Sequence, residues 1–337
     1  MNKKRIILFI IAISMVVIGL NWQMIIYGIQ QGKGQLNILT RAVDISELIT
    51  DKNVSDSIKI KLQWIQEIKQ FAQDSLGLAE TDNYTTYYDQ EGQPILWVVT
   101  ACPPYQMEEY KWDYPILGKL GYKGFFDKNK ADTEGKELLD LGYDVDVGEV
   151  NAWSTLGWFK DPVLSSMMKK NEGELARLII HELTHTTVYI SDDADFNENL
   201  ATFIGDNGAA KYMEQKYGVN SSELVNYQNH IVDLEKLAAH FLTGSKQLNT
   251  LYEHMSELSD GQKQQLKEGQ IGLIMANLDT IRFSSEHKFE HLKSSLFMPN
   301  NTFFMTYVMY RGNQKRLDSI FVDQFDSNYD RFIENWK

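Results

Sequence analysis

Hydrophobic positions divide the chain into three kinds of segment. Residues 6–20 are almost all apolar, and residues 84–155 hold short runs of aromatic and β-branched residues. From residue 221 onwards, apolar residues recur at intervals of three and four. Short runs separated by Gly, Pro or Asp predict antiparallel strands, and the three-and-four spacing predicts helices. The pattern therefore predicts an α+β protein with a mostly helical C-terminal half.

The same pattern places individual elements. A helix is expected over residues 54–76, with Ser55 or Asp56 as its N-cap and Gly77 at its end. Strands are expected over 84–88, 95–101, 110–116, 122–126, 143–147 and 149–155, with a helix over 127–141. Later helices are expected over 196–210, 223–241, 248–258, 261–283, 301–310, 318–325 and 329–336.

The N-terminal apolar run resembles a membrane segment. It follows Lys3, Lys4 and Arg5, and no further charge appears before Lys33. A helix from residue 6 to about residue 29 would cross a hydrocarbon core of ~30 Å. The basic start predicts a cytoplasmic N-terminus on a single-pass anchor in the cell membrane, with the body periplasmic or extracellular. A cleaved signal peptide is the alternative. Residues 30–35 are expected to form a polar, glycine-containing hinge.

Charge and cysteine content exclude some classes of function. Lys and Arg total 33 against 46 for Asp and Glu, a net charge of −13, which argues against nucleic-acid binding. The single cysteine, Cys102, allows neither an intramolecular disulfide nor a cysteine-based zinc site.

The strongest chemical signal lies at residues 174–203, which contain one H-E-x-x-H motif: His181, Glu182 and His185. Residues four apart share one face of a helix, so the two imidazoles can point at one ion. Glu182 lies at the edge of that face, where it can reach a water bound to the ion. These are the residue types of a hydrolytic zinc site. The apolar residues before the motif predict a buried helix, in which such polar groups are costly without a partner such as a metal.

A catalytic zinc usually has three protein ligands and a water. No third histidine follows within reach, and the available carboxylates are Asp192, Asp193, Asp195 and Glu198. If the helix after the break at 191–195 runs antiparallel to the first, Glu198 faces His185. The spacing Asp195-x-x-Glu198 also fits a capping box, so spacing alone leaves both roles open for Glu198.

Other segments offer candidate substrate contacts. The run just before the motif helix could be an edge strand that pairs with an extended peptide, or an edge without that role. Its candidate residues are Asn151, Ala152, Trp153, Ser154 and Thr155. In the C-terminal half, Tyr310 and Asn301 could donate a hydrogen bond to the oxyanion of a tetrahedral intermediate, with a structural role as the alternative.

The run ELARLIIHELTHTTVYISDDADFNENLATFIG resembles bacterial zinc-dependent aminopeptidases in which a glutamate is the third ligand. NAWSTLGWFKDPVL, GQLNIL and PNNTFF also resemble segments of that family. The resemblance implies a zincin-like fold and one Zn²⁺ per chain, with Glu198 completing the set begun by His181 and His185. The chain departs from the family in having no cysteine for a lipid anchor and in the length of residues 221–297.

Motif and resemblance together predict a membrane-anchored zinc peptidase, an aminopeptidase, that acts on peptides with Glu182 as general base. The expected regions are a cytoplasmic tip (1–5), a membrane span (6–29), a juxtamembrane helical segment (30–83), an α+β catalytic region (84–220) and a helical region (221–337). The alternatives are a zinc endopeptidase or other zinc hydrolase, and a non-catalytic metal-binding envelope protein. The sequence assigns no acidic pocket to a substrate α-amine, which leaves exopeptidase and endopeptidase open.

Overall fold

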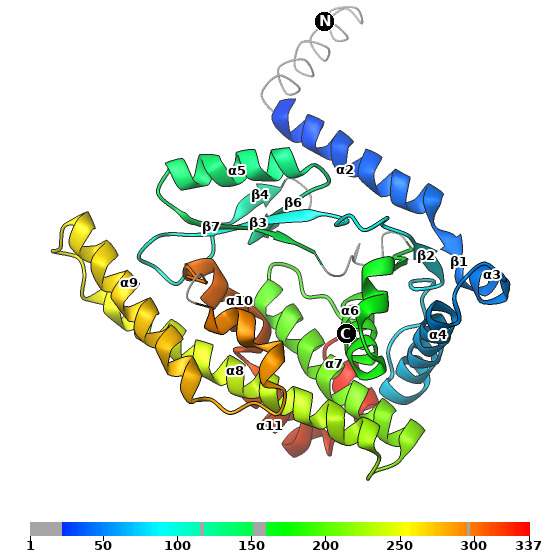
Figure 1. The fold of residues 1–337 in the computed structure, drawn as a ribbon. Coiled ribbons are helices and arrows are strands. Elements are labelled where there is room, and N and C mark those ends of the chain that lie inside the picture. The colour runs from blue at the N-terminus through cyan, green and yellow to red at the C-terminus, as the bar shows by residue number, and fades with distance from the viewer. Residues whose placement is uncertain (1–21, 115–117, 151–159, 295–296) are drawn as a thin grey trace, which may run out of the picture. The chain divides into compact units, whose positions relative to one another are not determined.

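The computed structural model describes residues 22–114, 118–150, 160–294 and 297–337 (Figure 1). The chain forms two compact units, Met1–Ala42 and Val43–Lys337. In the first unit, the described residues form helix α2 (Trp22–Arg41). Residues 30–35, expected as a hinge, lie inside this helix, so that prediction is wrong. Gly32 and Gly34 each weaken a helix by only about 1 kcal/mol, and the Gln and Lys residues around them are good helix formers.

The expected membrane span lies mostly before Trp22, outside the residues that the structure describes. Within the described ranges, no helix combines the length and the apolar character that crossing a membrane requires.

The second unit is α+β, as predicted, and contains three small sheets. β6 (Tyr122–Phe125), β3 (Trp97–Cys102) and β7 (Asp144–Glu149) form an antiparallel sheet in that order. β4 (Trp112–Tyr114) and β5 (Gly118–Leu120) form an antiparallel pair. β1 (Val43–Asp44) and β2 (Thr86–Tyr88) are also antiparallel, but β8 (Val163–Leu164) pairs parallel with β2. The predicted antiparallel pairing is therefore present, and β8 adds a parallel pair that the sequence did not predict.

Helices enclose the sheet β6-β3-β7. α5 (Lys128–Asp140) packs on one face and α10 (Asn301–Arg311) on the other, above and below the sheet in Figure 1. The remaining helices are α3 (Ile45–Thr50), α4 (Asp56–Leu76), α6 (Glu172–Thr187), α7 (Ala194–Tyr217), α8 (Ser222–Glu253), α9 (Asp260–Asn277), α11 (Gln314–Phe325) and α12 (Tyr329–Glu334), with short 3₁₀ turns at Ser165–Lys169, Leu278–Thr280, Glu286–Lys288 and Glu290–Lys293.

The caps of α4 agree with the sequence prediction. The Ser55 hydroxyl accepts from the backbone N–H of Ile58, and Gly77 ends the helix in the left-handed region at φ +68°. The two helices expected at 223–241 and 248–258 form one, α8. Gly244, between them, does not break the helix. A Cβ there would lie 2.9 Å from the Ile274 side chain, so the glycine lets α8 and α9 approach closely.

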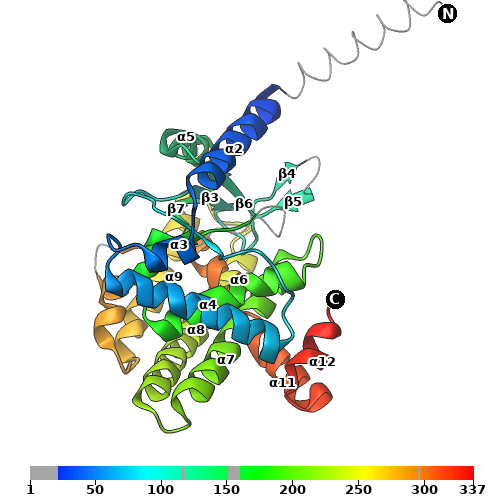
Figure 2. The same cartoon turned by 90° about the vertical axis from the view of Figure 1, so that its right-hand side faces the viewer.

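α6 and α7 form the centre of the unit, with α4 alongside both (Figure 2). Gly205 on α7 faces the backbone of α6: a Cβ there would lie 2.9 Å from the carbonyl oxygen of Arg177 and 3.2 Å from the Cβ of His181. The two helices can therefore approach closely at the turn that carries His181.

Gly205→Ala is expected to destabilise the protein by about 1–3 kcal/mol, because the added methyl meets backbone that cannot move without shifting α6 against α7. Urea unfolding measures this change. Gly269→Ala on α9 is the matched control. No atom lies within 4 Å of its added Cβ, so the better helix propensity of alanine should leave stability unchanged or slightly higher. Equal effects at the two positions would contradict the close approach described here.

Candidate metal centre

The motif lies on the second half of α6, and the sequence of α6 explains why the helix forms there. The Asn171 side chain accepts from the N–H of Glu174, whose carboxylate accepts from the N–H of Asn171, a complete capping box. The apolar positions Leu175, Ile179 and Leu183 are fully buried. Ala176 and Ile180 are fully buried as well, so the helix is buried on more than one side and the motif lies in the interior.

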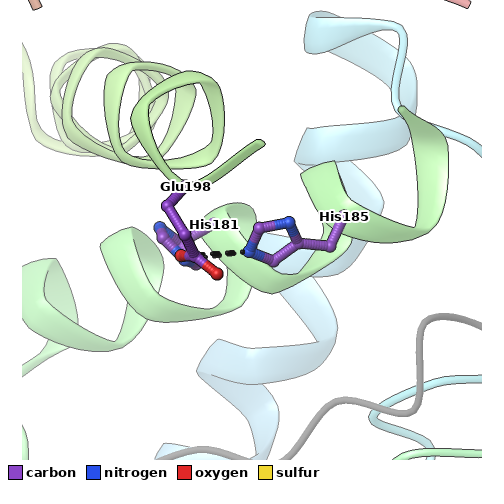
Figure 3. A group of neighbouring side chains, drawn as sticks. All are labelled: His181, His185 and Glu198. Atoms are coloured by element: carbon purple, nitrogen blue, oxygen red, sulfur yellow. Dashed lines mark hydrogen bonds and ion pairs between the residues drawn. The ribbon is translucent and has the colours of Figure 1, made fainter. Parts of the chain in front are cut away.

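Three side chains converge at the motif (Figure 3). The Nε2 atoms of His181 and His185 lie 3.2 Å apart. Oε2 of Glu198, on α7, lies 3.3 Å from the first and 3.5 Å from the second. One ligand atom from each residue falls within 4.8 Å of the others, so a single ion can contact all three. Zinc–ligand bonds of about 2.0–2.2 Å fit these separations with small side-chain adjustments.

The structure excludes one of the two roles left open for Glu198, that in a capping box. Asp193, not Asp195, is the N-cap of α7, and its side chain accepts from the N–H of Phe196. Glu198 is therefore not in a capping box, and its side chain is free to face the histidines. Its Oε2 is buried, with the Nε2 atoms of His181 and His185 at 3.3 and 3.5 Å as its polar neighbours and no other hydrogen-bond partner among the described residues. Burying such an oxygen is costly unless something satisfies it, and a cation between the three residues would do so.

The loop between α6 and α7 is closed by Asn197. Its side chain accepts from the backbone N–H of Ile190 at 2.9 Å and donates to the carbonyl of the same residue at 2.8 Å. Because Asn197 directly precedes Glu198, this closure fixes the start of α7 relative to the end of α6.

Local charge favours a cation at this point. Burial opposes ionisation of Glu198, but the two imidazoles outweigh it and hold the pKa of the carboxyl well below its usual range. Burial likewise disfavours protonated His185, yet Glu198 and Glu182 raise its pKa above the ordinary value. Glu182 is 8% exposed. Burial raises the pKa of Glu182. The two histidines oppose this shift, and the charge of Glu198 adds to it.

Tyr310 lies at the same site. Its ring stacks on the imidazole of His181, with centroids 6.2 Å apart and an interplanar angle of 20°. Burial and the charges of Glu198 and Glu182 raise the pKa of its hydroxyl well above the usual value. A hydrogen bond to Glu198 contributes to the raised pKa, and the phenol therefore keeps its proton.

Asn301 lies elsewhere, and its contacts fit the structural role that the sequence left open as the alternative. It is completely buried. Its amide donates to the carbonyls of Pro103, Pro104 and Gln106, at 2.9, 3.2 and 3.2 Å, and its Oδ1 accepts from Tyr252 at 2.7 Å. Both amide hydrogens are used, so none remains for a substrate. The other predicted substrate contacts lie outside the described residues: Asn151, Ala152, Trp153, Ser154 and Thr155.

Sequence reasoning missed the polar groups that surround the site. Asp206 on α7 accepts hydrogen bonds from Arg177 on α6 and from Arg311 on α10. Tyr84 is buried at φ +60°, and its hydroxyl has no hydrogen-bond partner among the described residues. The sequence could have indicated Arg177 as a residue near the site. It precedes His181 by one helical turn, the spacing at which side chains share a face.

Glu109, which follows β3, is a partly buried acid. Its carboxylate lies beside Gly121, close to where a Cβ of that residue would be. Burial raises its pKa to about 7, helped by the charge of Asp195 and opposed by Lys111. The folded protein therefore binds more protons than the unfolded chain between the ordinary value of 4.5 and about pH 7. Its stability falls as the pH rises through this window.

Glu109→Gln is expected to stabilise the protein at pH 8 and to change little at pH 5, because the amide removes the cost of a buried charge. The gain at pH 8 should be roughly 1–2 kcal/mol, less than the full shift implies, since the side chain is partly exposed. Urea unfolding at both pH values measures it. Glu108→Gln, at an exposed neighbour, is the control and should show no such difference. A pH-independent effect of Glu109→Gln would contradict the assignment.

The fold and the site define an α+β protein with a candidate His–His–Glu metal centre between two adjacent helices. Over residues 26–337 the chain matches the family model described as Putative aminopeptidase, and it belongs to that family. Membership indicates a hydrolase with peptidase activity, and so a peptide substrate. Searches of curated proteins and of solved structures found no match.

Proposed function

We propose that the protein is a zinc-dependent aminopeptidase with a zincin-like catalytic body, in which His181, His185 and Glu198 hold one Zn²⁺. The observation that carries the proposal is the convergence of these three ligand atoms around a buried carboxylate oxygen that has no other partner. Two histidines and a carboxylate are a zinc ligand set that leaves a position for water. The family supports the peptidase class of the reaction.

The chain's own residues can perform the proton transfers. Zinc bound at the site would polarise the scissile carbonyl and acidify water. Glu182 lies next to a ligand histidine on the same helix, and its raised pKa suits a group that first accepts a proton from the attacking water and then releases it to the leaving amine. Tyr310 keeps its proton and can donate a hydrogen bond to the oxygen on which negative charge develops.

The N-terminal apolar run supports a proposal about where in the cell this reaction takes place. We propose that residues 6–29 anchor the chain in the cell membrane with the catalytic body outside the cytoplasm, on the strength of the basic start and the apolar run that follows. Protease protection of the body in spheroplasts, lost when the cell membrane is lysed, would contradict this placement.

A matched peptide panel tests the proposed activity. The zinc-loaded full chain is incubated with peptides that have free N-termini and with the same peptides N-acetylated, and the products are identified by mass spectrometry. Release of single N-terminal residues from the free peptides alone supports an aminopeptidase. Equal internal cleavage of both sets would instead establish an endopeptidase. No cleavage of either set by a zinc-loaded, folded protein would overturn the enzyme assignment.

A further inference from the structure

Asn199 is completely buried on α7, directly after Glu198. Its side-chain amide donates to the carbonyl of Asp195 on its own helix at 2.8 Å and to the carbonyl of Met309 on α10 at 2.5 Å. Its Oδ1 accepts from the backbone N–H of Asn313 at 2.8 Å. One side chain therefore binds the backbone on both sides of the end of α10.

Tyr310 lies between the two points that Asn199 holds. Gln314 completes the arrangement, because its amide donates to the carbonyls of Asn199 at 2.9 Å and of Tyr310 at 3.1 Å. The C-terminal turn of α10 is thus attached by hydrogen bonds to the turn of α7 that carries Glu198.

Asp206 provides a second attachment two turns further along α7. Its carboxylate joins Arg311, the neighbour of Tyr310, to Arg177, which precedes His181 by one turn. These contacts therefore connect α6, α7 and α10 at a distance from the site. The three helices carry the two histidines, Glu198 and Tyr310, respectively. In this arrangement the Tyr310 ring stacks on the imidazole of His181.

We propose that Asn199 is a positioning residue that holds Tyr310 over the His181–His185–Glu198 site through the backbone of α10. The proposal rests on the proposed function, in which the Tyr310 phenol serves the developing oxyanion. Removing the amide leaves the Met309 carbonyl and the Asn313 N–H without their partner, so the end of α10 is free to shift. A displacement of about 1 Å is enough to cost on the order of 100-fold in rate.

A double-mutant cycle separates positioning from a general structural role. In the zinc-loaded full chain, Asn199→Ala and Tyr310→Phe should each lower kcat by about 10- to 100-fold with little change in KM. If Asn199 acts through Tyr310, the double variant should match Tyr310→Phe within about twofold. Losses that multiply in the double variant, or full activity of Asn199→Ala, would overturn the proposal.

The control is Asn207→Ala. Asn207 is on the same helix and also bonds a carbonyl four residues earlier, that of Phe203, but the structure gives its side chain no hydrogen bond to α10. This variant should keep wild-type kcat and KM. Asn199→Asp, which keeps the shape and the acceptor but loses the donor to Met309, replaces Asn199→Ala if the alanine variant does not fold.

A spectroscopic readout makes the test independent of activity. In the histidine-labelled, zinc-loaded protein, Tyr310→Leu removes the ring current on His181 and identifies the histidine signal that moves. Asn199→Ala should move the same signal in the same direction, and Asn207→Ala should not. If the wild type hydrolyses no peptide but this shift appears, the proposed function fails while the positioning role stands. If Asn199→Ala leaves the signal in place, the positioning role is wrong.

Discussion

Glu182→Gln is expected to lower kcat by about 1000-fold and to leave the zinc content at one ion per chain. Glutamine keeps the shape of the side chain but cannot accept a proton, and general acid–base groups contribute about 10²- to 10⁴-fold. Because Glu182 is outside the converging His–His–Glu group, the metal should bind as before. Kinetics on a free peptide and elemental analysis of the purified protein measure the two quantities.

Glu174→Gln is the matched control, since it makes the same exchange two turns earlier on the same helix, in the capping box. It should lower stability slightly and keep kcat. Wild-type turnover in Glu182→Gln would contradict the proposed base, and joint loss of zinc and activity would make Glu182 part of the metal site.

Replacing Glu198 by alanine is expected to weaken zinc affinity by more than about 100-fold. Loss of a partner that only orients a ligand costs about 10- to 100-fold, and loss of a ligand should cost more. The effect should also appear in stability. A ligand at 100 times its Kd stabilises the folded state by about 2.7 kcal/mol, so zinc should raise the Tm of the wild type and barely change that of Glu198→Ala.

Asp195→Asn separates the candidates for the third ligand. Asp195 is the competing carboxylate in the first turn of α7, and its pKa is raised by burial, but it does not belong to the converging group. This variant should bind zinc like the wild type in titrations of the chelator-stripped protein. Loss of zinc in Asp195→Asn with retention in Glu198→Ala would invert the assignment.

The strongly periodic parts of the fold were predictable from the sequence. The 54–76 helix and its caps, the strands around β3 and the motif helix follow from local spacing and capping chemistry, which act within a few residues. Local spacing did not predict that residues 30–35 are helical or that α8 is one continuous helix. Both segments contain glycine and interrupt the apolar periodicity, but both lie inside helices, and Gly244 packs against Ile274 on α9.

Some residues of the candidate site could likewise be predicted from local patterns in the sequence, and others could not. His181, Glu182 and His185 form a local pattern, so their shared place on one helix could be predicted. An antiparallel second helix made Glu198 a candidate, but its spacing also fitted a capping box, and the family resemblance favoured it as a ligand. Asn199 and Asn301 could not be told apart from the sequence, because both are asparagines on amphipathic segments. Only their contacts, more than 100 residues away for Asn199 and nearly 200 for Asn301, assign the first to the neighbourhood of the site and the second to the sheet.

The loop closed by Asn197 has a consequence for the order in which the protein matures. In zinc fingers the free energy of metal binding is the free energy of folding, so the apoprotein is unfolded. Here, burial between α6 and α7 and the two Asn197 hydrogen bonds set the spacing of the ligands without any ion. The apoprotein should therefore be a folded receptor for its metal. A chain whose body matures outside the cytoplasm, as proposed, could cross the membrane without zinc and acquire it at its destination.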